Sequence, residues 1–173
     1  MKIYTKRGDK GQTDVIGKRV KKSDIKMHIV GELDELAVRM AEFLSVCDNE
    51  AIIGDIKYID SVLFKTASIV IDINNKLGLS IQKENISFLE EKIDAMDEVL
   101  PPLKNFITYD GVIASIKASA LKTQTRAVER LMVEDDLDEH VVMFINRLSD
   151  YFFTLSRYIN YLANYTEEKR VLG

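Results

Sequence analysis

The sequence predicts an all-α protein, a five-helix bundle with a glycine-rich N-terminal arm. Two observations support this prediction. Apolar residues recur at spacings of three and four from about residue 28 onward, and no segment alternates with the period of two that is typical of a half-exposed strand. The 173 residues suit a single domain, which we expect to consist of an arm at 1–24 and a helical bundle at 25–166.

Each expected helix has its own apolar stripe. In chain order the stripes are Leu33, Leu36, Met40 and Leu44; Ile52, Ile56, Ile59, Leu63, Ala67 and Val70; Ile86, Leu89, Ile93, Met96 and Leu100; Ile113, Ile116, Ala120 and Ala127; and Val141, Phe144, Ile145, Leu148, Phe152, Leu155, Ile159 and Leu162. Pro101 and Pro102 end the third helix, because proline cannot continue the helical hydrogen-bond pattern. Short connections between the helices favour antiparallel packing of neighbours.

Composition and charge exclude several classes of protein. The net charge of -4 argues against a general nucleic-acid-binding protein, and no apolar run is long enough to predict a membrane span. The N-terminus lacks the apolar core of a signal peptide, and the single cysteine, Cys47, favours a reducing compartment. We therefore expect a cytoplasmic protein. His28 and His140 lack partners at metal-ligand spacing, so no metal site made of protein side chains is expected.

The N-terminal arm has the residue types of a polyphosphate-binding loop. Gly8 and Gly11 allow backbone N–H groups to approach an anion closely, and neighbouring lysine, arginine and threonine side chains supply charge and hydroxyl donors. The arm does not fit a Walker A loop. Gly11 and Gly17 enclose five residues where that motif has four, and Arg19 follows Lys18 where serine or threonine is required. A flexible basic terminus with a few turns is the alternative interpretation.

A row of cations marks the fourth expected helix. Lys122, Arg126 and Arg130 recur every four residues, so they share one face at intervals of about 6 Å. Clustered arginines suit phosphate oxygens, whereas a solvated face with Glu129 and Glu134 as local partners is the alternative.

Two polar residues interrupt apolar stripes. Asn146 lies among core-type residues of the last helix, where it is either a hydrogen-bond partner between helices or a nucleotide contact. Asp34 and Glu35 are expected in the first turn of a helix, where acids favour the helix dipole. Alternatively, Asp34 is the partner of a cation on another helix.

Five segments together resemble the PduO-type cobalamin adenosyltransferase family. They are 4–13 (YTKRGDKGQT), 31–36 (GELDEL), 100–107 (LPPLKNFI), 126–130 (RAVER) and 144–150 (FINRLSD). The segments occur in the family's order and extend over almost the whole chain. This resemblance implies a five-helix bundle of ferritin-like architecture that assembles as a homotrimer, with ATP bound between neighbouring subunits.

The resemblance also implies the activity and the site. The 5′-deoxyadenosyl group of ATP would pass to Co(I) of a corrinoid such as cobalamin, giving adenosylcobalamin and triphosphate, with Mg²⁺ accompanying ATP as MgATP. The ATP-binding residues would be Thr5, Lys6, Arg7, Gly8, Gly11, Thr13, Asp14, Lys22, Arg126, Glu129, Arg130 and Asn146. Catalysis and corrinoid binding would involve Arg126, Asp34, Lys122 and Phe106, with Phe106 on the lower face of cobalt. A corrinoid reductase and an adenosylcobalamin-dependent enzyme are the expected protein partners.

Several positions depart from the family pattern, among them Val30, where the family commonly has tyrosine, and the segment 66–82, which lacks the family's usual glycines and aspartates. Two departures concern the predicted site. Lys122 occupies the position at which the family has an arginine paired with the aspartate of its Asp-Glu-Leu motif. The segment 108–111 reads Thr-Tyr-Asp-Gly where the family usually has Leu-Pro-Gly-Gly. A diverged ATP-binding relative that senses nucleotide or carries corrinoid is therefore the alternative function. A helical scaffold without a ligand is a third interpretation, which the glycine-rich arm disfavours.

Overall fold

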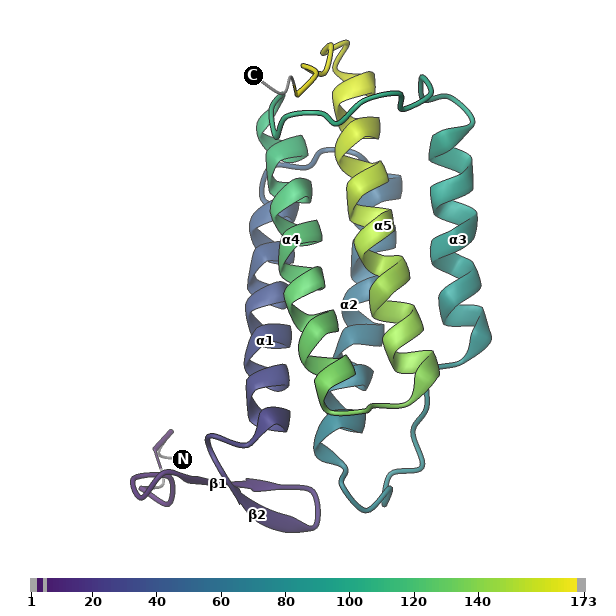
Figure 1. The fold of residues 1–173 in the computed structure, drawn as a ribbon. Coiled ribbons are helices and arrows are strands. Elements are labelled where there is room, and N and C mark those ends of the chain that lie inside the picture. Colours follow the sequence, from purple (N-terminus) through teal and green to yellow (C-terminus); the bar gives the residue numbers. More distant parts are fainter. Residues whose placement is uncertain (1–2, 5, 171–173) are drawn as a thin grey trace.

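The computed structural model describes residues 3–4 and 6–170, which form a β-hairpin followed by five α-helices (Figure 1). The hairpin consists of β1 (Gln12–Val15) and β2 (Lys18–Lys21). The helices are α1 (Ile25–Leu44), α2 (Glu50–Ile71), α3 (Lys83–Asp97), α4 (Ile113–Glu134) and α5 (Glu139–Leu162). Successive helices run in opposite directions, so the predicted all-α five-helix bundle is confirmed.

Side chains just before three of the helices define where they begin. Asp24 accepts a hydrogen bond of 3.0 Å from the backbone N–H of Lys26, and Asn49 accepts from the backbone at the start of α2. Asp138 accepts a hydrogen bond of 3.0 Å from the N–H of His140 at the start of α5. Each cap satisfies a backbone donor that has no partner within its helix.

The core of the bundle is centred on α5. This helix packs against α3 and α4, while α1 packs against α2 and α4. The largest fully buried side chains are Tyr151, Phe43, Phe144, Phe152, Ile29, Leu36, Met40, Ile56, Ile59, Ile81, Leu89 and Leu121. Full burial of an apolar side chain of this size contributes about 1.5–3 kcal/mol, so the core positions the helices firmly.

The predicted apolar stripe of α4 is wrong. Ile113 and Ile116 are exposed, the former to 64%, and the buried face is instead Ser115, Ala118, Ser119, Leu121, Thr125, Val128 and Met132. Small and hydroxyl-bearing residues can be buried here because a helix supplies acceptors for them. Thr125, for example, donates from Oγ1 to the carbonyl oxygen of Leu121 at 2.8 Å.

Two further expectations differ from the structure. Asp34 and Glu35 lie in the middle of α1 and not in its first turn, because the helix already begins at Ile25. The arm contains a short antiparallel hairpin in which Gln12 faces Lys21 and Val15 faces Lys18, although no strand was predicted. Strands of four residues are too short to show a clear alternation in the sequence.

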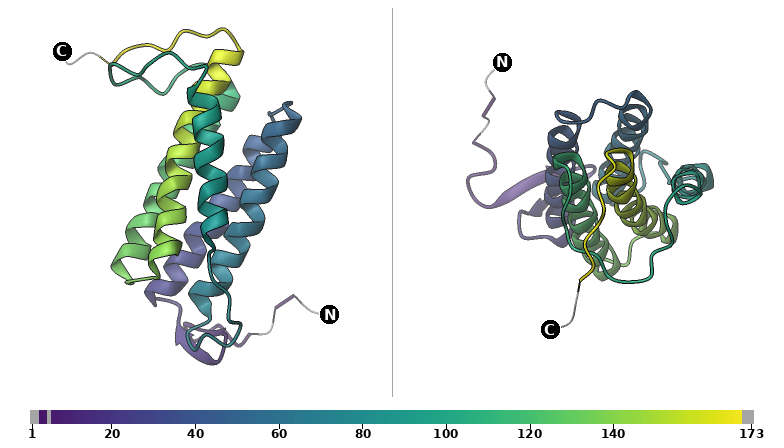
Figure 2. Two further views of the ribbon diagram at one scale, coloured as in Figure 1. Left: turned by 90° about the vertical axis from the view of Figure 1, so that its right-hand side faces the viewer. Right: turned by 90° about the horizontal axis from the view of Figure 1, so that it is seen from above.

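The arm and the loop after α3 lie at opposite ends of the bundle (Figure 1). The arm contacts the end where α2 finishes, since the N–H of Ile16 donates to the carbonyl oxygen of Ile71 at 3.2 Å. At the other end, the loop after α3 and the C-terminal segment run alongside each other (Figure 2). Within the described part of the chain, none of the helices is both long and apolar enough to span a membrane.

Candidate functional site

The first part of the arm folds back on itself around Gly8 and Gly11. The N–H of Gly11 donates to the carbonyl oxygen of Gly8 at 3.1 Å, and the N–H of Lys22 donates to that of Gly11 at 2.9 Å. Gly11 has a φ of 72°, a conformation that favours glycine. The amine of Lys22 lies over Gly8, since a Cβ at Gly8 would come within 3.1 Å of Lys22 Nζ. The amine of Lys22 thus lies close to glycine backbone that a phosphate can approach, which is an arrangement typical of phosphate-binding loops.

The other predicted arm residues are distributed around this turn. Lys6 is exposed with its amine 6.0 Å from the ring centre of Tyr4, and Thr13 is half-buried in β1. Asp14 forms ion pairs of 3.0 Å with both Arg7 and Arg19, so within the chain its carboxylate orders the hairpin. Thr5 was also predicted to bind ATP but lies outside the described residues.

The row of cations on α4 is exposed to solvent over most of its length. Arg126 and Arg130 form no ion pair or hydrogen bond with the described residues. The predicted local pairing with Glu129 is absent among these residues, because Glu129 points to α5 and accepts a hydrogen bond of 2.8 Å from Nδ2 of Asn146. Two guanidinium groups on adjacent turns are therefore available to an anion.

Glu129 and Asn146 line a hollow between the end of α4 and the start of α5. Its volume is about 380 Å³, and Val133, Val142 and Met143 supply its apolar surface. The hollow combines these apolar side chains with the Asn146 amide and the carboxylates of Glu129, Asp136 and Glu139, which can accept hydrogen bonds from the amino and hydroxyl groups of a nucleoside. The structure thus brings Glu129 and Asn146 together next to the predicted phosphate-binding arginines.

Lys122, one turn before Arg126 on α4, faces a small cavity at the other end of the row. Its amine lies 5.5 Å from the ring centre of Tyr109 and 5.3 Å from that of Phe153, and 3.4 Å from the Tyr109 hydroxyl. The cavity measures about 100 Å³ and is also lined by Phe106. The prediction missed Tyr109 and Phe153 as site residues, because only the packing of α5 and the loop on α4 brings these rings to Lys122.

Asp34 is not the partner of Lys122 within the chain. Asp34 is exposed on α1 and forms no ion pair with the described residues, whereas Lys122 is occupied by the two aromatic rings. Phe106 is 86% exposed. It belongs to the loop between α3 and α4, which lies at the opposite end of the bundle from the arm (Figure 1). The arm and the Phe106 loop, which belong to one predicted site, are therefore separated along the bundle axis.

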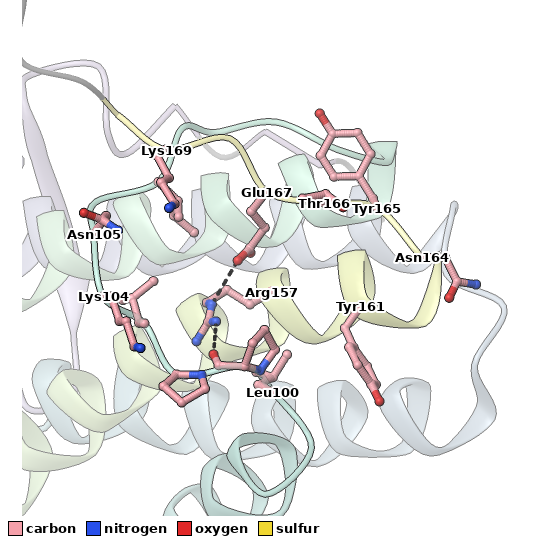
Figure 3. A pocket seen from close by; sticks show the side chains of 14 residues that line it. Leu100, Lys104, Asn105, Arg157, Tyr161, Asn164, Tyr165, Thr166, Glu167 and Lys169 are labelled. Atoms are coloured by element: carbon pink, nitrogen blue, oxygen red, sulfur yellow. Dashed lines mark hydrogen bonds and ion pairs between the residues drawn. The ribbon is translucent and has the colours of Figure 1, made fainter.

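A larger pocket lies between the loop after α3 and the C-terminal segment (Figure 3). It has a volume of about 520 Å³, and the buried Arg157 of α5 crosses its floor. Arg157 donates to the carbonyl oxygen of Pro101 at 2.7 Å and pairs with Glu167 at 3.2 Å. The loop that carries Phe106 is thus anchored to α5 at its start. Among the described residues, no group of three or more His, Cys, Asp or Glu side chains is arranged to hold a metal ion.

Comparisons with known proteins agree with this geometry. Residues 3–159 match the family described as cobalamin adenosyltransferase. A corrinoid adenosyltransferase of Bacillus subtilis is 34% identical over 168 residues, which cover 92% of this chain and 87% of that protein. The human corrinoid adenosyltransferase MMAB is 32% identical over 171 residues, covering 91% of this chain and 68% of that protein.

Solved structures of the same kind share the fold. A variant of the PduO-type ATP:corrinoid adenosyltransferase from Lactobacillus reuteri, in complex with cobalamin and ATP, superimposes with a TM-score of 0.91. It is 32% identical in sequence, and the match covers 98% of this chain and 96% of that one. Sequence and fold thus agree over nearly the whole length of the chain, which belongs to the cobalamin adenosyltransferase family and resembles its PduO-type members.

Proposed function

We propose that this protein transfers the 5′-deoxyadenosyl group of ATP to the Co(I) of a corrinoid, giving adenosylcobalamin and triphosphate. Family membership and the neighbouring structures that contain cobalamin and ATP support this proposal. The observation that carries it is the row Lys122, Arg126 and Arg130 on α4. The row begins in the cavity beside Phe106 and continues past Glu129 and Asn146 toward the end of the bundle.

The chemistry places specific demands on the protein. Co(I) of the corrinoid substrate donates an electron pair to the 5′ carbon of ATP, so a Co–C bond forms while the C5′–O bond breaks. The electron pair of the broken bond leaves with triphosphate. Arg126 and Arg130 would stabilise the charge that develops on the leaving group, together with the Mg²⁺ that accompanies ATP. The substrate provides the nucleophile, so the protein acts mainly by positioning the two reactants.

The separation of the arm from Phe106 supports a site shared between subunits. The 24 residues of α5 extend over about 36 Å, which approximates the distance between the two ends of the bundle. No hydrogen bond or ion pair joins the described arm residues to Arg126 or Arg130. An arm from a neighbouring copy would complete the phosphate site, and a homotrimer is a closed arrangement in which every copy both gives and receives an arm.

The corrinoid side of the site would be formed by Phe106, Asp34 and Lys122. The exposed ring of Phe106 can cover the lower face of the cobalt, displace the axial base and leave a four-coordinate corrinoid that is reduced to Co(I) more easily. Asp34 is free to pair with a cation of a neighbouring copy, or to accept a hydrogen bond from an amide of the corrinoid.

One anaerobic experiment tests the activity. The protein is mixed with MgATP and chemically reduced cob(I)alamin, and the absorbance change to adenosylcobalamin is followed together with release of triphosphate. We expect both products to form in equal amounts and in proportion to protein concentration. Absence of both, with ATP binding retained in calorimetry, would overturn the transferase proposal.

The contacts of Lys122 favour a second candidate function. Its amine is held near the rings of Tyr109 and Phe153, in the small cavity beside Phe106, and is therefore engaged within the chain. A protein that binds ATP but not corrinoid productively, acting as a nucleotide sensor or a corrinoid carrier, would show this arrangement. In the assay above it would bind ATP without turnover.

The cellular setting follows from the same proposal. The reaction consumes Co(I), so an enzyme that reduces corrinoids must supply the substrate, and an adenosylcobalamin-dependent enzyme would use the product. The cytoplasm is the proposed compartment, because the single cysteine, Cys47, is a free thiol.

A further inference from the structure

The carboxylate of Asp110 joins the loop that carries Phe106 to the C-terminal segment. Its Oδ2 accepts a hydrogen bond of 2.6 Å from the hydroxyl of Thr108 and one of 3.2 Å from the backbone N–H of Glu168. A bond to an ionised acceptor is stronger than one between neutral groups. Asp110 therefore fixes two segments that lie 58 residues apart in the chain.

Backbone hydrogen bonds next to Asp110 hold Phe106 itself. The N–H of Arg170 donates to the carbonyl oxygen of Phe106 at 2.8 Å, and the N–H of Thr108 donates to that of Glu168 at 2.9 Å. Ile107 and Lys169 form an antiparallel bridge between these two bonds. Because the Phe106 ring is mostly exposed, its position depends on this pairing of its main chain more than on side-chain packing.

The helix α5 supports the pairing of the Phe106 loop with the C-terminal segment, which we call the junction. Asn160, which is 3% exposed, donates from Nδ2 to the carbonyl oxygen of Asp110 at 3.2 Å and accepts from the N–H of Val112 at 3.3 Å. Gly111 has a φ of 104° and packs directly on Asn160, so no side chain fits at position 111. Arg157 bonds to Pro101 at the start of the loop and also to Glu167 in the C-terminal segment (Figure 3). Asp110 thus lies between two points that are rigidly attached to the core.

The second oxygen of Asp110 is buried at a cost. Oδ1 accepts no hydrogen bond from the described residues, and a buried acceptor without a partner is destabilising by about 1–3 kcal/mol. The unpartnered Oδ1 therefore lowers local stability. The hydrogen bonds of Oδ2 to Thr108 and Glu168 offset this cost.

We propose that Asp110 is a positioning residue that sets the place of Phe106 under the corrin ring. The inference depends on the proposed transferase function, because Phe106 has this task only there. Asp110 acts through the main chain of 106–108 and not by touching a substrate. Its loss should therefore affect corrinoid use and leave ATP use unchanged.

The test compares Asp110→Ala, which removes both acceptors, with Asp110→Asn, which keeps one oxygen for Thr108 and Glu168. Thr108→Val removes a single bond to the carboxylate. Asp97→Ala is the matched control, an exposed acid at the same end of the bundle without a hydrogen bond or ion pair to the described residues. Hydrogen–deuterium exchange of the amides of Thr108 and Arg170 reports the junction independently of activity.

For Asp110→Ala we expect faster exchange at both amides and a fall of about tenfold or more in kcat/KM for cobalamin, with an unchanged KM for ATP. The fall should be clearly smaller with a corrinoid that lacks the lower axial base. The yield of four-coordinate cob(II)alamin, followed spectroscopically in the presence of MgATP, should drop in parallel. Asp97→Ala should stay close to the parent protein. Thr108→Val and Asp110→Asn should lie in between, because Asn keeps an acceptor oxygen but not the charge that strengthens its hydrogen bonds.

Equal losses with and without the axial base, or a loss expressed in the KM for ATP, would overturn the positioning role. Unchanged exchange at Thr108 and Arg170 in Asp110→Ala would overturn the structural part of the inference. A parent protein that forms no adenosylcobalamin, but whose exchange pattern responds to Asp110→Ala, would instead refute the transferase function while leaving the junction intact.

Discussion

Asn146 of α5 donates a hydrogen bond of 2.8 Å to the carboxylate of Glu129 on α4, next to the two arginines without partners in the described chain. This bond directs Glu129 away from Arg126 and Arg130, so their charge is not neutralised locally. The arginines thereby remain available to an anionic ligand, which a simple solvated face with internal ion pairs would not provide.

Replacing Asn146 tests this relationship. Asn146→Ala should lower the free energy of unfolding by about 1 kcal/mol, because one half-buried hydrogen bond is lost. It should also weaken ATP binding in calorimetry, since Glu129 can then turn toward Arg126 or Arg130. Asn146→Asp places a second carboxylate beside Glu129 and should destabilise the protein more. Unchanged ATP affinity in both variants would mean that Asn146 only joins the helices.

Arg126→Ala should abolish most activity without unfolding the bundle. The side chain is exposed and forms no hydrogen bond or ion pair with the described residues, so its removal leaves the core intact. Loss of one group that stabilises leaving-group charge typically lowers kcat about 100- to 1000-fold. The control is Lys57→Ala, which removes an exposed cation on α2. Steady-state kinetics and thermal unfolding provide the measurements, and full turnover at saturating ATP would contradict the assignment.

Phe106→Ala should impair adenosylation chiefly when the lower axial base must be displaced. The ring is 86% exposed, so the melting temperature should not change. Phe64→Ala is a matched control, because Phe64 on α2 is 79% exposed and far along the chain from the loop. Turnover is compared for cobalamin and for a base-free corrinoid. An equal loss with the two substrates would argue against a role on the lower face of cobalt.

The fold was predictable where burial follows residue type. The last helix illustrates this, since Phe144, Leu148, Phe152 and Leu155 are both the predicted stripe and the observed core. In α4 the same procedure failed, because Ser115 and Thr125 are buried while Ile113 is exposed. Apolar periodicity does not detect a buried face made of small residues and of hydroxyls that bond back to their own helix.

The site was predictable where it depends on local spacing. The row of cations on α4 follows directly from residues four apart on a helix. Tertiary contacts were not predictable in this way: Lys122 meets Tyr109 and Phe153 only because α4, α5 and the loop pack together. The role of Asp110 likewise depends on the C-terminal segment folding back over the loop.

Gly8→Ala should weaken ATP binding with little effect on stability. The new Cβ would come within 3.1 Å of Lys22 Nζ, the end of a flexible side chain, so Lys22 moves and the arm stays folded. The amine is then displaced from the backbone N–H groups that would bind phosphate. Gly54→Ala in α2 is the control, since a Cβ there meets nothing within 4 Å and should stabilise the helix by about 0.5–1 kcal/mol. Calorimetric ATP affinities that are equal in the two variants would contradict the arm's role.

Lys122 and Asp34 provide the sharpest test of a site shared between subunits. They do not pair within one chain, so any ion pair between them must form across an interface. Lys122→Asp and Asp34→Lys should each lower kcat/KM for cobalamin by about tenfold or more, because a like-charge contact replaces the pair.

Combining Lys122→Asp with Asp34→Lys should restore a substantial part of that loss, and sedimentation should show a trimer again where the single variants dissociate. The matched control combines Lys117→Glu with Glu42→Lys, which reverses an ion pair of 3.2 Å that joins α4 to α1 within one chain. If the double variant is no more active than the weaker single variant, Lys122 interacts with Tyr109 and Phe153 and does not pair with Asp34. In that case the two residues would act on the corrinoid separately, and Lys122→Arg would be expected to lower activity by crowding Tyr109.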